Sequence, residues 1–187
     1  MEILEDFYTT VAEEASAEFE EKRSRFIGYA APAPDEETAM SFVKKIKALH
    51  ADATHNVYAY SLRAGQIKRA SDDGEPQGTG GVPMLNVLNG NELVDVCCVV
   101  TRYFGGILLG AGGLVRAYTQ AIKAGLENST IIEKCYATKV LMYTDYNGIG
   151  KIQYILGQQN IKIIDSEYSD QVIITALVPE AQVENIM

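Results

Sequence analysis

The stretch TRYFGGILLGAGGLVRAY, residues 101–118, decides how most of the chain folds. It begins as the end of an apolar run, reaches two glycines, and then opens an amphipathic segment with three more glycines. The apolar run, residues 92–104, predicts a central strand covered on both faces. Residues 112–128 predict a helix, because their apolar side chains recur at helical spacing. The residues expected on its buried side are Val115, Tyr118, Ile122 and Leu126.

The residues before this stretch extend the pattern to an α+β domain. The expected elements, in chain order, are a strand (18–31), a helix (35–50), a strand (55–65), a glycine-rich loop (66–81), a short helix (82–91), the central strand and the long helix. Asp35 or Thr38 is expected to cap the first helix. Strands and helices in this order predict one α+β domain.

After residue 132 the pattern restarts as a strand, a helix, two strands and the beginning of a helix. This βαββα order is typical of a ferredoxin-like domain that lacks its last strand. We therefore expect two domains, residues 1–132 and residues 133–187, with the final strand of the second domain missing.

Composition limits the partners of the protein. The net charge is -9, and eight acids precede the first basic residue, Lys22. This balance argues against general binding to nucleic acid or anionic membranes and leaves room only for a local basic patch. Cys97, Cys98 and Cys135 form no CxxC pair and are expected to be thiols in a reducing cytoplasm. The longest apolar run is too short to span a bilayer, and the N-terminus does not match a signal peptide, so we expect a cytoplasmic protein without a membrane partner.

Glycine is concentrated where chemistry is expected: ten of the sixteen glycines fall within residues 74–113. In one interpretation, free N–H groups at the start of the long helix bind an anion, and flanking cations add charge-assisted bonds. In the other, Gly105 and Gly106 form a tight turn, while the glycines that open the helix allow it to pack closely on the sheet. The predicted anion-binding or RNA-binding residues are Lys68, Arg69, Arg102, Gly110, Gly112, Gly113 and Arg116.

Named phosphate and metal motifs are incomplete. A GxGxxG motif starting at Gly110 would need glycine where Val115 stands, and no GK[ST] sequence exists for a P-loop. The acidic segment SDDGEP, residues 71–76, is one candidate for a divalent cation, but an acidic turn is the preferred interpretation. We expect neither a metal nor a cofactor.

His55 is the main catalytic candidate. It could act as a general base with Ser71 as the nucleophile and Asp72 as its partner, which would make a hydrolase. The alternative is a histidine that hydrogen-bonds to nearby backbone.

Four segments carry a resemblance to a known family: RSRFIGYA (23–30), HNVYAY (55–60), SDDGEPQGTGGVPML (71–85) and VVTRYFGGILLGAGGLVRAY (99–118). They resemble the IMPACT family, in particular its bacterial YigZ-like branch, over roughly residues 18–130. The rest of the chain is similar to the ferredoxin-type second domain of bacterial members. Two residues depart from the pattern: Leu108 stands where relatives commonly have lysine, and Gln77 stands where they often have serine.

The resemblance implies a first domain with the α+β fold shared by a small-subunit ribosomal protein and domain IV of the translocating elongation factor. The second domain would resemble a later domain of that factor. The eukaryotic relative restrains a kinase that phosphorylates an initiation factor, with help from an N-terminal domain that does not occur here, so that partner does not carry over.

The preferred hypothesis is a non-enzymatic regulatory protein associated with translation. It would bind RNA, the ribosome or a translation-linked protein through the loop 66–81, Arg102 and the helix that carries Arg116. One alternative is a hydrolase or a small-molecule phosphotransferase that uses His55 and the glycine-rich loops. Another is a regulator that binds only proteins. No complete catalytic signature is present, so an enzyme is not the preferred hypothesis.

Overall fold

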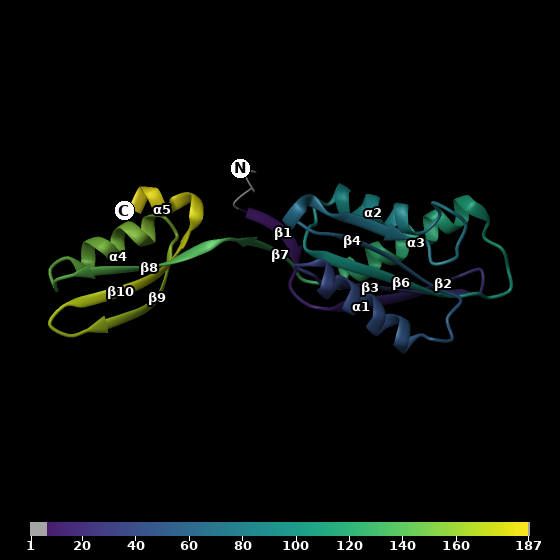
Figure 1. The fold of residues 1–187 in the computed structure, drawn as a ribbon, viewed down its shortest axis with the longest axis horizontal. Helices are drawn as coiled ribbons and strands as arrows, with labels where there is room; N and C mark the ends of the chain where they lie inside the picture. Colours follow the sequence, from purple (N-terminus) through teal and green to yellow (C-terminus); the bar gives the residue numbers. More distant parts are fainter. Residues whose placement is uncertain (1–6, 187) are drawn as a thin grey trace. The chain divides into compact units, whose positions relative to one another are not determined.

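Figure 1 shows the fold in a computed structural model, of which residues 7–186 are described. The chain divides into two compact units. Of the described residues, one unit is Thr9–Glu133, and the other comprises residues 134–186 with Phe7 and Tyr8. The fold class is α+β, as predicted. The outer ends of the two expected domains, residues 1–6 and residue 187, lie outside the described residues.

The first unit is built on a five-stranded antiparallel sheet. Its strands, in spatial order, are β2 (Ala15–Glu21), β3 (Ser24–Pro32), β6 (Val96–Tyr103), β4 (His55–Ser61) and β5 (Lys68–Ser71). The strand β6 is central and buried along nearly its whole length, as predicted from its apolar run. Its side chains alternate between two cores, with Cys98 and Val100 in one and Cys97 and Val99 in the other.

Helices cover both faces of this sheet (Figure 1). The helices α2 (Gly81–Gly90) and α3 (Gly110–Glu127) pack on one face, and α1 (Glu36–Leu49) packs on the other. Asp35, one of the two predicted caps, accepts a hydrogen bond from the Thr38 N–H at 2.7 Å. In α3, the residues buried are Leu114, Ala117, Tyr118, Ala121, Ile122, Gly125 and Leu126. The expectation for Val115 was wrong, because it lies beside this stripe and stays 37% exposed.

The prediction of a single strand over residues 18–31 was also wrong. The structure has a hairpin there, in which β2 and β3 meet at Lys22 and Arg23. Both residues have positive φ angles, 47° and 63°, as a two-residue hairpin turn requires. Such turns usually carry Asn-Gly or Asp-Gly, so Lys-Arg gives no signal in the sequence.

Four further short elements were not predicted. The strand β5 begins inside the expected loop, after a 3₁₀ turn, η1, at Ala64–Gln66. The strand β1 (Phe7–Val11) pairs with β7 (Ile131–Cys135) in a two-stranded sheet. Short edge elements of this kind leave little hydrophobic pattern in the sequence.

The second unit has the expected βαββα order. Its elements are β8 (Ala137–Thr144), α4 (Ile149–Gln158), β9 (Lys162–Tyr168), β10 (Val172–Pro179) and α5 (Glu180–Ile186). The antiparallel sheet has the order β8-β10-β9, so the third strand lies between the first two, as in a ferredoxin-like fold.

The cysteines are free thiols. Cys97 and Cys98 are buried, and burial raises the pKa of Cys97 to about 12. Cys135 is half-buried. Among the described helices, none has the length and apolar character needed to cross a membrane.

A close contact between helix and sheet in the first unit uses glycines that the sequence analysis did not single out. A Cβ on Gly28 would lie 2.1 Å from the Ala121 carbonyl oxygen, and one on Gly125 would lie 2.9 Å from the Gly28 carbonyl oxygen. The backbones of β3 and α3 therefore touch directly. Gly112 and Gly113 do not serve this contact, since a Cβ there meets only Arg116 or Leu109 of the same segment.

We expect Gly125→Ala to destabilise the protein by about 1–3 kcal/mol, because its methyl group would push α3 away from the β3 backbone. Gly112→Ala is the matched control in the same helix, where the added Cβ lies 3.6 Å from Arg116 Nη1 and meets nothing else. It should be neutral or stabilising by up to about 1 kcal/mol. Urea unfolding followed by circular dichroism measures both, and equal effects would contradict the proposed contact.

Candidate functional site

Arg102, near the end of β6, is buried rather than displayed at the surface. It is 5% exposed, and its Nη1 donates to Glu75 Oε1 at 2.6 Å. Its Nη2 lies 3.4 Å from Ser24 Oγ, and its guanidinium packs over the rings of Phe26 and Phe104. The charge of Arg102 is therefore compensated inside the protein. Its predicted role in anion binding stays a prediction, but the guanidinium does not face solvent here.

Glu75 is the hub of this buried network. Its side chain is 3% exposed, and besides the Arg102 bond its Oε1 accepts the hydroxyl of Tyr118 at 2.7 Å. His55 Nε2 lies 3.8 Å from the second carboxylate oxygen. Burial, followed by the charge of Glu75, raises the pKa of Tyr118 well above its ordinary value. One carboxylate thus links β4, β6 and α3 to the glycine-rich loop.

Asp72 gives the loop its shape. Its carboxylate accepts the backbone N–H groups of Gly78 at 2.8 Å and of Gly80 and Gly81 at 2.9 Å. Burial alone would raise the pKa of Asp72, but these three hydrogen bonds outweigh it and lower the pKa below the ordinary value. Because Gly81 begins α2, Asp72 also places an anion at the positive end of that helix.

Asp73 fastens the same loop to β4 and α1. Its carboxylate accepts the Asn56 N–H at 2.7 Å and pairs with Lys47 Nζ at 2.5 Å. Its backbone oxygen lies 2.8 Å from His55 Nδ1. The three acids of the segment 71–76 are thus used as internal partners, which agrees with an acidic turn. Within the described part of the chain, no group of three His, Cys, Asp or Glu side chains is placed to hold a metal.

The three residues proposed for a hydrolase, His55, Ser71 and Asp72, lie in one region, but their side chains bind different groups. The His55 nitrogens face the Asp73 carbonyl and Glu75, while Ser71 Oγ accepts the Asp73 N–H at 3.3 Å. The Asp72 carboxylate binds the glycine N–H groups. These contacts do not form the chain from base to nucleophile that a hydrolase requires.

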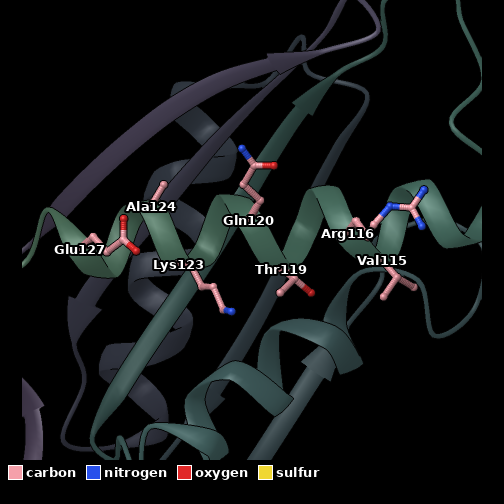
Figure 2. A pocket seen from close by; sticks show the side chains of 7 residues that line it. All are labelled: Val115, Arg116, Thr119, Gln120, Lys123, Ala124 and Glu127. Atoms are coloured by element: carbon pink, nitrogen blue, oxygen red, sulfur yellow. The ribbon is translucent and has the colours of Figure 1, made fainter.

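Arg116 lies on the exposed side of α3, together with other polar side chains. Figure 2 shows two rows along the helix: Arg116, Gln120 and Ala124 on one side, and Val115, Thr119 and Lys123 on the other. With Glu127, these side chains line a shallow cavity of about 410 Å³. The row that ends at Lys123 also borders a cavity of similar volume against α2.

A smaller recess lies at the N-terminal end of α3. Its volume is about 170 Å³, and its lining includes Lys22 of the hairpin turn, Glu21, Gly113, Arg116 and Gln120. The helix starts at Gly110, with a φ of 72°, and the residue before it, Leu109, makes no side-chain capping bond. The predicted glycines and Arg116 therefore share the N-terminal end of α3, and the structure adds Lys22 there. Lys123 lies further along the same helix and lines the larger cavity with Arg116.

The remaining predicted cations lie elsewhere. Lys68 and Arg69 are exposed on β5, at the edge of the sheet opposite β2, whereas α3 packs over β2 and β3. The predicted residues thus fall into three places: the β5 edge, the buried network of Arg102, and α3. Sequence reasoning did not separate them, because strand alternation alone does not say which partner a buried cation meets.

Comparison with known proteins agrees with this architecture. The family model for the Impact N-terminal domain matches residues 22–126, and one for a domain of unknown function, DUF1949, matches residues 144–187. The chain belongs to the IMPACT family. The resemblance stated from the sequence motifs is therefore confirmed.

Bacterial relatives in the IMPACT family match most of the chain. The family member YvyE of Bacillus subtilis is 42% identical, over 94% of this chain and 81% of its own. The member YigZ of Escherichia coli is 40% identical, over 87% of this chain and 81% of its own. A crystal structure of a hypothetical protein, 37% identical, covers 98% of this chain and 90% of its own, with a TM-score of 0.71.

We expect Glu75→Gln to lower the free energy of unfolding by about 3 kcal/mol, because it leaves the buried Arg102 guanidinium without a counter-charge. The matched control is Glu18→Gln, since Glu18 pairs with Arg25 where both side chains are more than half exposed. Such an exposed pair contributes little to stability. Urea unfolding at neutral pH compares the two, and similar losses would show that the buried pair is not a structural hub.

Asp72 predicts a pH dependence of stability. Because its folded pKa is lowered, its contribution is complete above the unfolded value of about 3.9 and is lost as the pH falls through the folded value. We expect Asp72→Asn to cost about 1–3 kcal/mol at neutral pH, with a difference from the parent that narrows as the pH falls below about 3.9. Urea unfolding over this range tests it, with Glu20→Gln on exposed β2 as the control. A gap that stays constant with pH would contradict the role of the charge.

Proposed function

We propose that this chain is a non-enzymatic, translation-associated binding protein of the IMPACT family that contacts RNA on the ribosome through α3. The observation that carries the proposal is the position of Arg116. Arg116 is exposed near the N-terminal end of α3, which begins at Gly110. It lines one recess together with Lys22 and a second cavity together with Lys123. Family membership supports the association with translation, since the resemblance implies domains shared with a ribosomal protein and an elongation factor.

The charge distribution supports a local contact rather than general affinity for polyanions. At the N-terminal end of α3, the helix dipole, Arg116 and Lys22 add positive potential in one place. Glu21 borders the same recess and Glu127 lies at the far end of the helix, so the positive region is small. With a net charge of -9, distant phosphates are repelled, and only a strand that fits the α3 surface gains contacts.

A translation-linked protein is the second candidate partner. The loop that leads into α3 exposes three apolar side chains: Phe104 at 45%, Ile107 at 40% and Leu108 at 82%. Exposed apolar side chains next to a charged helix are typical of protein-binding surfaces. This candidate predicts binding that changes little with salt.

Fluorescence anisotropy with ribosomal RNA and transfer RNA, over a salt series, tests the proposal. Arg116→Ala with Lys123→Ala should raise the Kd roughly tenfold or more and reduce the slope of log K against log salt by about two. The matched control is Lys68→Ala with Arg69→Ala, which removes the same charge at the β5 edge and should bind nearly as the parent does. Circular dichroism confirms that all variants stay folded.

The outcomes separate the parts of the proposal. If only the Lys68→Ala, Arg69→Ala variant lost binding, RNA would remain the partner, but its binding surface would be at β5 and not on α3. No binding by the parent at low salt would overturn the RNA proposal. Leu108→Lys, which introduces the residue common in relatives, then tests the protein-binding candidate by its effect on co-sedimentation with ribosomes.

A further inference from the structure

The sheet of the C-terminal unit has one covered face and one open face. The helices α4 and α5 pack against Val172, Ile174, Ala176 and Val178 of the middle strand β10. Because side chains alternate along a strand, the residues between them point to the other face. Those residues are Ile173, Thr175 and Leu177.

The strand register identifies the other residues of the open face. Directly opposite partners in an antiparallel sheet share a face. On β8 the partners are Tyr143, Leu141 and Lys139, and on β9 they are Glu167, Asp165 and Lys162. The register shifts between Thr175 and Ala176, which leaves Ile164 as an extra residue on β9. Ile164 follows the inward-facing Ile163 and so also lies on the open face.

This open face exposes several large apolar side chains to water. Tyr143 is 63% exposed, Leu141 48%, Ile164 42% and Leu177 38%. An antiparallel sheet with one solvated face normally alternates apolar and polar residues, with the polar ones outward. Here exposed apolar side chains lie beside charged ones, and the central residue, Thr175, is polar and only 5% exposed. Exposed apolar side chains mixed with charges have the composition of an interface.

We propose that this open face is a self-association surface on which a second copy of the chain stacks. The distribution of charges on the face is the reason for choosing a second copy as the partner. Lys139 and Lys162 flank Leu177 at one end of the face, and Asp165 and Glu167 lie toward the other end. Two cations and two acids leave the face without a net charge, which favours neither a polyanion nor a strongly basic partner.

The same layout selects one arrangement of the two copies. Consider a two-fold axis in the plane between the two stacked sheets and perpendicular to their strands. It places one end of each strand over the opposite end of the same strand in the partner subunit. It brings Lys162 toward Glu167 of the partner subunit and Lys139 toward the ring of Tyr143 of the partner subunit, a cation–π arrangement. An axis along the strands would instead place lysines against lysines. Stacked sheets of this kind pack about 10 Å apart.

The size of the face predicts a weak dimer. The strands β8 and β10 have eight residues each. With a rise of about 3.4 Å per residue and a strand spacing of about 4.8 Å, three strands project roughly 380 Å². Two such faces total about 760 Å², below the roughly 1,200 Å² of stable specific interfaces, so we expect a weak, transient dimer with a dissociation constant on the order of 100 µM.

Sedimentation velocity of the full-length chain, from about 1 µM to several hundred µM, tests the proposal. The parent should pass from monomer to dimer. Lys162→Glu should weaken the dimer at least tenfold, because it places acid against acid, and Glu167→Lys should do the same with lysine against lysine. The double variant, with both changes, should dimerise as the parent does because the complementary pair is restored.

Two controls make the result specific. Lys151→Glu, on the exposed side of α4, makes the same charge change away from the open face and should leave the dimer unchanged. An equimolar mixture of the two single variants should form heterodimers. A parent that stays monomeric at the highest concentration, or a dimer that neither single variant weakens, would overturn the proposal.

Discussion

The ion pair between Glu75 and Arg102 holds the glycine-rich loop onto the sheet, and much of the first unit depends on it. Both side chains are almost fully buried, and the carboxylate also receives the Tyr118 hydroxyl from α3. Burying two charges costs desolvation energy that their attraction only partly returns. In the described part of the chain, Arg102 Nε is buried without a hydrogen-bond partner, so the pair is not fully satisfied. Its main effect is to specify one arrangement of β6, α3 and the loop.

This use of Arg102 also determines what the surface can offer. The guanidinium of Arg102 is paired inside the protein with Glu75, and Asp72 and Asp73 of the loop bind backbone N–H groups and Lys47. Arg116 is left as the predicted cation at the start of α3. A chain with a large negative charge thus has a small positive region at the start of α3.

The parts of the fold that could be predicted have a strong local pattern. The apolar run of β6, the helical spacing of α3 and the Asp35 cap are each explicit in the sequence. The hairpin turn at Lys22 and Arg23 was missed because its backbone requires positive φ without the usual glycine or asparagine. The Arg102 side chain points inward to Glu75, and Gly28 contacts Gly125. Both contacts join residues far apart in the sequence, so no local pattern could reveal them.

The adjacent cysteines of β6 have a consequence for studying motion in the first unit. Cys97 contacts the Ala39 carbonyl of α1 through its thiol, while Cys98 belongs to the core beneath α2 and α3. Two neighbouring thiols therefore report on opposite layers of the molecule. Local opening of α1 would uncover the first thiol and leave the second protected, and opening of the other layer would do the reverse. The protein carries its own pair of layer-specific probes, separated by a single peptide bond.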